Sequence, residues 1–244
     1  MSKLVWDTSG ERKYETGVDH GVLFVQKKNG EYEKGVVWNG LKTVTESPEG
    51  AEENAQYADN MKYLALYSAE EWKGSIEAFT YPPEFEQCDG TKEIAPGAYI
   101  GQQNRTGFAL YYRTKVGTDT DSNAGYKHHF VYGMKASPSE KEHATVNDSP
   151  EPTSFSWDVT AIKQVVEGFD PSATFTLDST LVDQTKLKSI TDKVEGSATS
   201  DSTLPSITEL ISAVKARRRE CSRSTLMQTS ITIEQLESSS TLNL

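Results

Sequence analysis

The chain has few features that would suit a disulfide framework or a membrane. Its 244 residues include two cysteines, Cys88 and Cys221, and their separation matches no metal-binding or redox motif. So few cysteines favour a reducing compartment, where disulfides are rare. No apolar run approaches the roughly 18 residues that a membrane helix needs. No apolar h-region follows Met1, so no signal peptide is expected. We expect synthesis and folding in a cytoplasm.

Basic and apolar side chains are also scarce. The 25 Lys and Arg residues are outnumbered by 36 Asp and Glu residues, and the net charge is −11. This balance repels phosphate backbones and anionic membranes, so stable binding to nucleic acid or to a membrane is not expected. The apolar fraction is 35%, below the globular norm of roughly 45–50%. Part of the chain is therefore unfolded, or much of its surface is polar and extended.

Motifs of catalysis are missing. The sequence contains no Gly-rich phosphate loop, no G-x-S-x-G, no H-E-x-x-H and no paired C-x-x-C. His128 and His129 are adjacent, and adjacent residues of a strand point to opposite faces, so they would not converge on one metal ion. Asp7, Asp19 and His20 are better explained by turn hydrogen bonds than by acid–base chemistry. We expect no enzyme activity, no metal and no cofactor.

The first two thirds of the chain have strand patterns. Asn29-Gly30 separates Gly21–Gln26 from Val36–Trp38, and Asn-Gly between two β-type runs predicts a hairpin. Further strands are predicted over residues 72–81, 107–116, 126–134, 155–165 and 173–177. Pro83 suits the first turn of a short helix over Glu84–Cys88. Helical spacing appears only later, over Val182–Val194 and Leu204–Val214. The predicted fold is mainly β with C-terminal helical segments.

The segment Asn39–Asp59 is acidic, contains Pro48 and Gly50, and has almost no large apolar side chain. Strand-like runs lie at its two ends, Leu41–Thr45 near its start and Asn60–Tyr67 directly after it. One interpretation is a solvated loop. The other is a long hairpin arm that reaches a neighbouring subunit, because long structureless connections are uncommon in compact domains unless they are disordered or functional.

Two compositional features bear on organisation. Tyrosines are concentrated in the strand half, which fits either ordinary β-propensity or a protein interface. After Lys215 the sequence becomes rich in Ser and Thr and loses its periodicity, and its Arg217–Arg219 run is typical of a solvated basic stretch. We predict one domain over residues 1–215 and a flexible tail over residues 216–244.

Several short runs, taken in their order along the chain, resemble the major tail proteins (tail tube proteins) of long-tailed bacteriophages that infect Gram-positive hosts. The resemblance extends roughly from Ser9 to Val214. The runs that carry it are Gly17–Gly21, Val36–Leu41, Ser47–Ala51, Tyr57–Asn60, Ile76–Gly90, Phe155–Trp157 and Leu177–Thr180. None of them is a catalytic signature, and the tail after Lys215 departs from the family pattern.

The resemblance implies a β-sandwich or half-barrel with one short flanking helix. Six subunits would form a hexameric ring around a shared inner β-barrel, and rings would stack into the tail tube of a virion. Phage DNA would pass through without stable binding. The partners would be other copies of the chain, a tape-measure protein and tail-end proteins. The loop over residues 39–59 would contact the next ring through Glu46, Pro48, Glu49, Glu52, Glu53 and Tyr57.

A DNA conduit should not carry unpaired cations on its inner surface, because neutralising phosphates releases counterions and strengthens binding. We therefore expect an acidic lumen with Glu77 facing it, and Lys62, Arg113 and Lys115 either paired with acids or outside. Two alternatives remain open. One is a tube subunit of a phage-derived tail-like particle or of a secretion tube. The other, of a different class, is a carbohydrate-binding β-sandwich adhesin.

Overall fold

The computed structural model describes residues 4–143, 145 and 152–215. Strand accounts for 45% of the residues and helix for 12%, which confirms the prediction of a mainly β fold. The chain divides into two compact units, residues 1–205 and residues 206–244. The predicted tail over residues 216–244 lies outside the described residues.

The largest sheet has eight strands, joined in the order β2-β1-β9-β10-β11-β6-β3, with β12 also paired to β10. Its strands are β1 (Lys13–Val25), β2 (Val36–Trp38), β3 (Leu41–Glu46), β6 (Trp72–Ala78), β9 (Phe108–Thr118), β10 (Gly125–Ala136), β11 (Phe155–Ala161) and β12 (Thr174–Asp178). Two separate hairpins pair β4 (Glu53–Ala58) with β5 (Met61–Tyr67) and β7 (Lys92–Ala95) with β8 (Ala98–Ile100). Every pairing is antiparallel.

The predicted first hairpin is present. Gly21 of β1 pairs with Trp38 of β2, and the Gly30 N–H donates to the Lys27 carbonyl at 3.0 Å with Gly30 at φ +89°. The short helix is smaller than predicted, a single 3-10 turn η1 over Pro83–Phe85. Pro83 occupies its first position, where the missing N–H removes no hydrogen bond.

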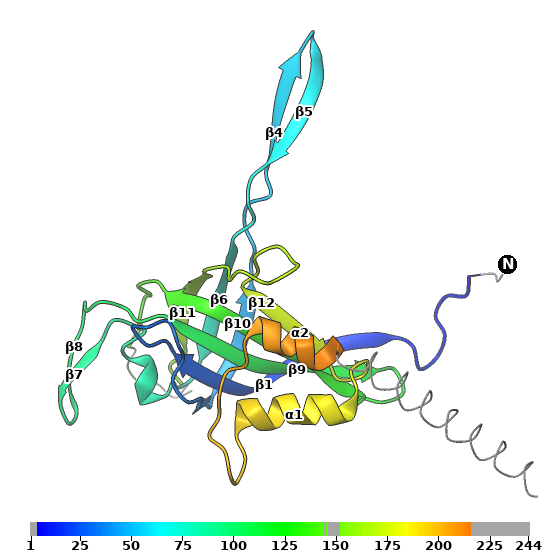
Figure 1. The fold of residues 1–244 in the computed structure, drawn as a ribbon. Helices are drawn as coiled ribbons and strands as arrows, with labels where there is room; N and C mark the ends of the chain where they lie inside the picture. The colour runs from blue at the N-terminus through cyan, green and yellow to red at the C-terminus, as the bar shows by residue number, and fades with distance from the viewer. Residues whose placement is uncertain (1–3, 144, 146–151, 216–244) are drawn as a thin grey trace, which may run out of the picture. The chain divides into compact units, whose positions relative to one another are not determined.

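The large sheet bends within β10. On the side of β10 opposite β9, residues 127–131 pair with β12 and residues 134–136 pair with β11. The register shifts between Val131 and Met134, and Gly133 between them has φ +62°, which favours glycine. The bend separates layer A (β2, β1, β9, β10 and β12) from layer B (β11, β6 and β3). In Figure 1, β6 of layer B crosses the direction of β9 and β10.

The main core lies between the two layers. Buried side chains from layer A pack with those of layer B into one cluster: Leu23, Trp38, Phe108, Leu110 and Met134 with Ile76, Ala78, Trp157 and Val159. Phe85 of η1 sits within it, with ring centroids 4.6 Å from Trp38 and 5.0 Å from Trp157. Burial of these large side chains, at roughly 25 cal/mol per Å² of apolar area, holds the layers together.

The bend at Gly133 yields a stability prediction. A Cβ at Gly133 would lie 2.8 Å from the Ile162 carbonyl oxygen and would occupy a positive φ. Gly168 also has positive φ, +77°, but a Cβ there meets nothing within 4 Å. Gly168→Ala should therefore cost about 1–2 kcal/mol from backbone strain alone, and Gly133→Ala should cost more. Urea unfolding measures the free energy of unfolding of both variants. Equal decreases for Gly133→Ala and Gly168→Ala would contradict a tight bend at Gly133.

The opposite face of layer A is covered by the helix α1 (Gln184–Glu195), whose Leu187, Ile190 and Val194 are buried. Asp183 caps its first turn by accepting from the Thr185 N–H at 3.2 Å. The prediction over Val182–Val194 is thus confirmed. The second predicted helix is α2 (Ile207–Lys215), which belongs to the second unit.

Candidate functional site

A two-stranded arm extends the β3–β6 pair of layer B, and we define it as residues 47–71. The ladder continues through a bridge between Glu49 and Glu71, then through the Ser68 N–H, which donates to the Glu52 carbonyl at 3.1 Å. Beyond that point β4 and β5 pair with each other, and Figure 1 shows their hairpin standing beyond the end of β6. The segment Asn39–Asp59 is therefore not a loop, because it holds β3 and β4. After β3 it forms the first strand of the hairpin arm, whose second strand is β5.

The arm exposes large apolar side chains that are normally buried. They are Tyr57, Met61, Tyr63, Leu64, Leu66 and Tyr67. Successive residues of a strand point to opposite faces, so Tyr63 and Tyr67 lie on one face of β5 while Leu64 and Leu66 lie on the other. An isolated two-stranded ribbon is marginally stable in water. This ribbon has two apolar faces and two open edges, which suits contact with another protein surface.

Two of the predicted contact residues instead fix the base of the arm. Glu46 accepts a hydrogen bond from the Tyr112 hydroxyl at 2.6 Å and one from the Trp72 indole N–H at 3.4 Å. Glu49 pairs with Lys73 at 2.6 Å. Burial, followed by the hydrogen bond to Glu46, raises the pKa of Tyr112 far above its ordinary value, so its hydroxyl remains a donor. The arm is thereby anchored to β9 and β6.

The other predicted contact residues lie along the arm itself. The Glu52 N–H donates to the Ser68 hydroxyl at 3.0 Å, and Glu53 forms an ion pair with Lys62. Pro48 is exposed, and the Tyr57 side chain near the tip is 73% exposed. The structure therefore places Glu46, Pro48 and Glu49 at the base of the arm and Glu52, Glu53 and Tyr57 farther out, with Tyr57 the most exposed large side chain among them.

The predicted lumen residue Glu77 lies on the face of β6 that points away from the core, since its neighbours Ile76 and Ala78 are buried. Lys42 pairs with it at 3.2 Å. Two of the three cations that we expected to be paired with acids or outside the lumen do form ion pairs. Lys62 pairs with Glu53, Arg113 pairs with Asp19 at 2.9 Å, and Lys115 is exposed.

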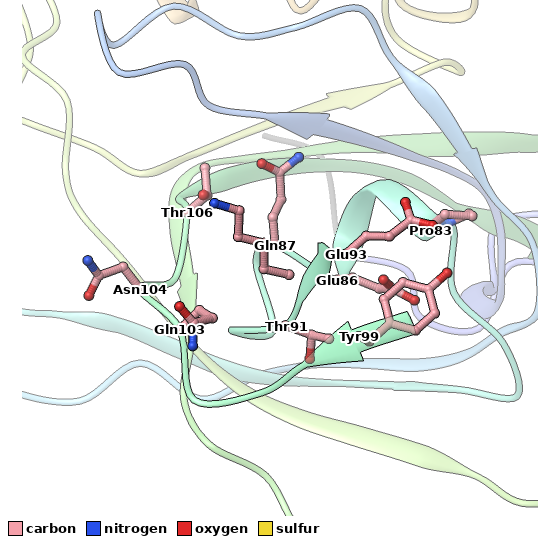
Figure 2. A pocket seen from close by; sticks show the side chains of 10 residues that line it. Pro83, Glu86, Gln87, Thr91, Glu93, Tyr99, Gln103, Asn104 and Thr106 are labelled. Carbon is pink, nitrogen blue, oxygen red and sulfur yellow. The ribbon is translucent and has the colours of Figure 1, made fainter. Parts of the chain in front are cut away.

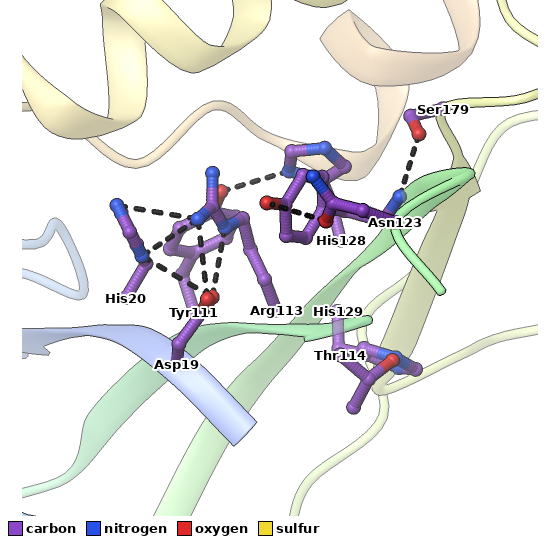
Figure 3. Close-up of polar contacts among 10 residues, drawn as sticks. Asp19, His20, Tyr111, Arg113, Thr114, Asn123, His128, His129 and Ser179 are labelled. Carbon is purple, nitrogen blue, oxygen red and sulfur yellow. Dashed lines mark hydrogen bonds and ion pairs between the residues drawn. The ribbon is translucent and has the colours of Figure 1, made fainter. Parts of the chain in front are cut away.

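A polar cluster lies on the α1 side of layer A, where Figure 3 shows Arg113 between β1 and the helix. Its guanidinium donates to Asp19 at 2.9 Å, contacts His20 Nδ1 at 2.7 Å and lies 4.3 Å from the centre of the Tyr126 ring. Hydrogen bonding and attraction to Arg113 lower the pKa of Asp19 even though burial opposes this. The pair is internally neutralised, which is typical of a structural ion pair.

The two adjacent histidines diverge. His128 Nδ1 is 2.8 Å from the Tyr111 hydroxyl in a buried contact on the α1 side. His129 Nε2 is 2.9 Å from the Thr114 hydroxyl, on the opposite face. Burial, then the positive charge of Arg113, lowers the pKa of His128 to about 4, so the ring is neutral at neutral pH. Burial also raises the pKa of Tyr111 far above its ordinary range. We interpret the buried contact between His128 and Tyr111 as a packing contact rather than a proton-transfer pair.

Because the pKa of His128 is lowered in the folded chain, the free energy of unfolding should depend on pH. Between its ordinary pKa of 6.5 and its folded pKa of about 4, the unfolded chain binds a proton that the folded chain excludes. Stability should therefore fall as pH drops through this window, by at most about 3 kcal/mol. Denaturant unfolding at pH 7, 5.5 and 4 measures the slope. His128→Gln should flatten the slope relative to the wild type, and an unchanged slope would assign it to other groups.

A shallow pocket of about 340 Å³ lies between η1 and the β7–β8 hairpin. Figure 2 shows Glu86, Glu93 and Tyr99 turned toward it. Burial, then the nearby charge of Glu93, raises the pKa of Glu86. Within the part of the chain that the structure describes, no three His, Cys, Asp or Glu side chains are grouped to hold a metal ion.

The chain matches no protein-family model and no curated protein. In the described residues, no helix combines the length and the apolar character that a membrane crossing requires. Of the arm's exposed aromatic residues, sequence reasoning named Tyr57 as a contact residue and indicated Tyr63 and Tyr67 only through the enrichment of Tyr in the strand half. It did not predict that Glu46 would accept a hydrogen bond from Tyr112.

Proposed function

We propose that this chain is a structural subunit that polymerises with copies of itself, as hexameric rings stacked into the tail tube of a long-tailed bacteriophage. The subunit would have the tail-tube form of a β-sandwich or half-barrel, and the tube would conduct DNA into the host. The resemblance of the sequence motivates the choice of a tail tube. The observation that supports self-assembly is the arm, an anchored ribbon with exposed apolar residues on both faces.

In an assembly of this symmetry, one arm per subunit is enough to stack the rings. A contact between two different surfaces closes into a ring when the rotation closes, and it builds a filament when it does not. An arm at one end of layer B that binds a different surface of the next copy is a contact of the second kind. The exposed tyrosines and leucines would then be buried at each ring-to-ring junction, and apolar burial would supply the free energy of stacking.

The charge distribution is compatible with passage of DNA. The net charge is −11, and several cations are held in ion pairs, including Arg113 with Asp19 and Lys62 with Glu53. A paired cation releases few counterions from a phosphate backbone, so it adds little to DNA affinity. We infer that DNA would slide past the subunits without stable binding, and that the chain needs no cofactor.

Concentration-dependent sedimentation tests the proposal. Purified protein, incubated at rising concentration, should shift from a slow species to rapidly sedimenting polymers. Binding to immobilised glycans provides the contrasting test for an adhesin, whose exposed tyrosines would stack on sugar rings. A chain that stays monomeric at every concentration and binds glycans would favour the adhesin. A tail-like particle or a secretion tube would sediment in the same way, and neighbouring capsid and tape-measure genes would distinguish the virus.

A further inference from the structure

Two turns of the chain have the sequence Asn-Gly, the pair in which asparagine most readily loses its side-chain amide. Asn29-Gly30 lies between β1 and β2, and Asn39-Gly40 lies between β2 and β3. In this reaction the backbone nitrogen of the following residue attacks the side-chain carbonyl carbon of asparagine. Glycine favours the attack because it has no Cβ in the path and its backbone rotates freely. All four residues are exposed to water, which completes the reaction.

The turn at Asn29 holds its reacting groups in hydrogen bonds. The side-chain nitrogen of Asn29 donates to Glu31 Oε2 at 2.8 Å, and the side-chain oxygen accepts from the Glu31 N–H at 3.2 Å. The Gly30 N–H, whose nitrogen would have to attack, donates to the Lys27 carbonyl at 3.0 Å. Attack requires the nitrogen to lose its proton and the Asn29 side chain to rotate. Both steps break hydrogen bonds, so the reaction at Asn29 should be slow.

The turn at Asn39 leaves its reacting groups unrestrained. Among the residues that the structure describes, neither the Asn39 side chain nor the Gly40 N–H has a hydrogen-bond partner. The turn is held by groups that the reaction does not use. The Gly40 carbonyl accepts from the Phe79 N–H at 2.9 Å. The indole N–H of the buried Trp38 donates to the Thr80 carbonyl at 3.0 Å.

We propose that Asn39 is a site of spontaneous deamidation and that Asn29 is protected from it. The Gly40 nitrogen, after giving its proton to hydroxide, forms a bond to Cγ of Asn39. The bond from Cγ to Nδ2 breaks, and this nitrogen takes a proton from water and leaves as ammonia. The product is a five-membered succinimide ring. Water then opens the ring at one of its two carbonyl carbons, which gives aspartate or isoaspartate. The inference does not depend on the proposed function.

Isoaspartate at Asn39 would alter the turn between β2 and β3. The former side-chain methylene becomes part of the main chain, and a carboxylate becomes the branch, so the turn grows longer and gains a negative charge. Trp38 is fixed by burial, and β3 begins at Leu41. The added length must therefore be taken up at Gly40, whose carbonyl would move away from the Phe79 N–H. The turn lies at the end of the β3–β6 pair opposite the arm, so the arm should be unaffected.

Peptide mapping by mass spectrometry tests the proposal on full-length protein that is aged at mildly alkaline pH. Mass distinguishes acid from amide, and a protease that cuts before aspartate leaves isoaspartate uncut. Asn39 should react at least about tenfold faster than Asn29, since a factor of ten in rate corresponds to about one hydrogen bond. Equal rates, or a faster reaction at Asn29, would overturn the proposal. So would an unmodified Asn39 after a time in which a short peptide of the same sequence has reacted.

Two variants test the physical cause of the difference. Glu31→Ala removes the acceptor of the Asn29 side-chain nitrogen, so it should speed the reaction at Asn29 and leave the rate at Asn39 unchanged. Asn39→Gln is the matched control, because glutamine would have to form a six-membered ring, and the acid at this position should disappear from the map. No acceleration in Glu31→Ala would overturn the protection assigned to the first turn.

Hydrogen exchange of aged and fresh protein measures the structural consequence. The Phe79 N–H should lose protection in proportion to the isoaspartate formed, while the Ser68 N–H, which donates to the Glu52 carbonyl in the arm, should keep its own. Unchanged protection at Phe79 in fully converted protein would contradict the displaced carbonyl.

Discussion

Replacing Glu53–Tyr67 with Asn-Gly should give a folded monomer that no longer forms polymers. The Glu52 carbonyl accepts from the Ser68 N–H at 3.1 Å, so a two-residue turn can close the ribbon there, and Asn-Gly suits such turns. Melting temperature should stay within a few degrees, because the lost side chains are exposed. Sedimentation of the variant and the wild type at the same concentrations measures the loss of assembly.

Point variants test whether the tyrosine side chains of the arm, and not only its backbone ribbon, are needed for polymerisation. Changing Tyr57, Tyr63 and Tyr67 to Ser keeps the ribbon and removes its aromatic surface. Tyr99→Ser is the matched control, since Tyr99 is 49% exposed on β8, outside the arm. The triple variant should weaken polymerisation strongly and the control should not. Polymers of normal length from the shortened arm would contradict its role in assembly.

Trp157→Ala should cost about 3–5 kcal/mol, the range for removing a large buried aromatic side chain. Trp157 is fully buried in β11 and contacts Trp38, Phe85 and Tyr81, whose ring centroids lie within 5.9 Å of its own. Such a loss is comparable with the whole stability of many domains. The cavity would open where the two layers meet, so both should unfold together.

Urea unfolding, monitored by tryptophan fluorescence and by circular dichroism, measures the free energy of unfolding that Trp157→Ala loses. Phe79→Ala is the control, because Phe79 follows β6 and is 46% exposed, and it should cost less than about 1 kcal/mol. A cost for Trp157→Ala as small as that of the control would show that the two layers do not depend on this cluster.

The sequence predicted strands best where one face is buried. Alternation and Asn29-Gly30 located the first hairpin, and β-rich runs located β9 and β10. A hairpin arm was one of two interpretations of its segment, but the strand β4 itself was not predicted. Glu53–Ala58 is mostly exposed, so no buried face imposes a period on its sequence. Its strand state depends on the ladder to β5, which is a property of pairing rather than of pattern.

Long-range register could not be predicted either. The bond between Tyr112 and Glu46 joins residues 66 apart in sequence. The split of β10 between β12 and β11 depends on the shift beside Gly133. Sheet register follows from which strands meet, and one sequence does not reveal that.

Electron microscopy of the purified full-length protein, after prolonged storage at high concentration, tests the central claim most directly. Assembly predicts hollow tubes built from stacked six-fold rings, with the β4–β5 arm of each subunit in contact with the adjacent ring. Isolated monomers at every concentration, or aggregates without rings, would contradict it.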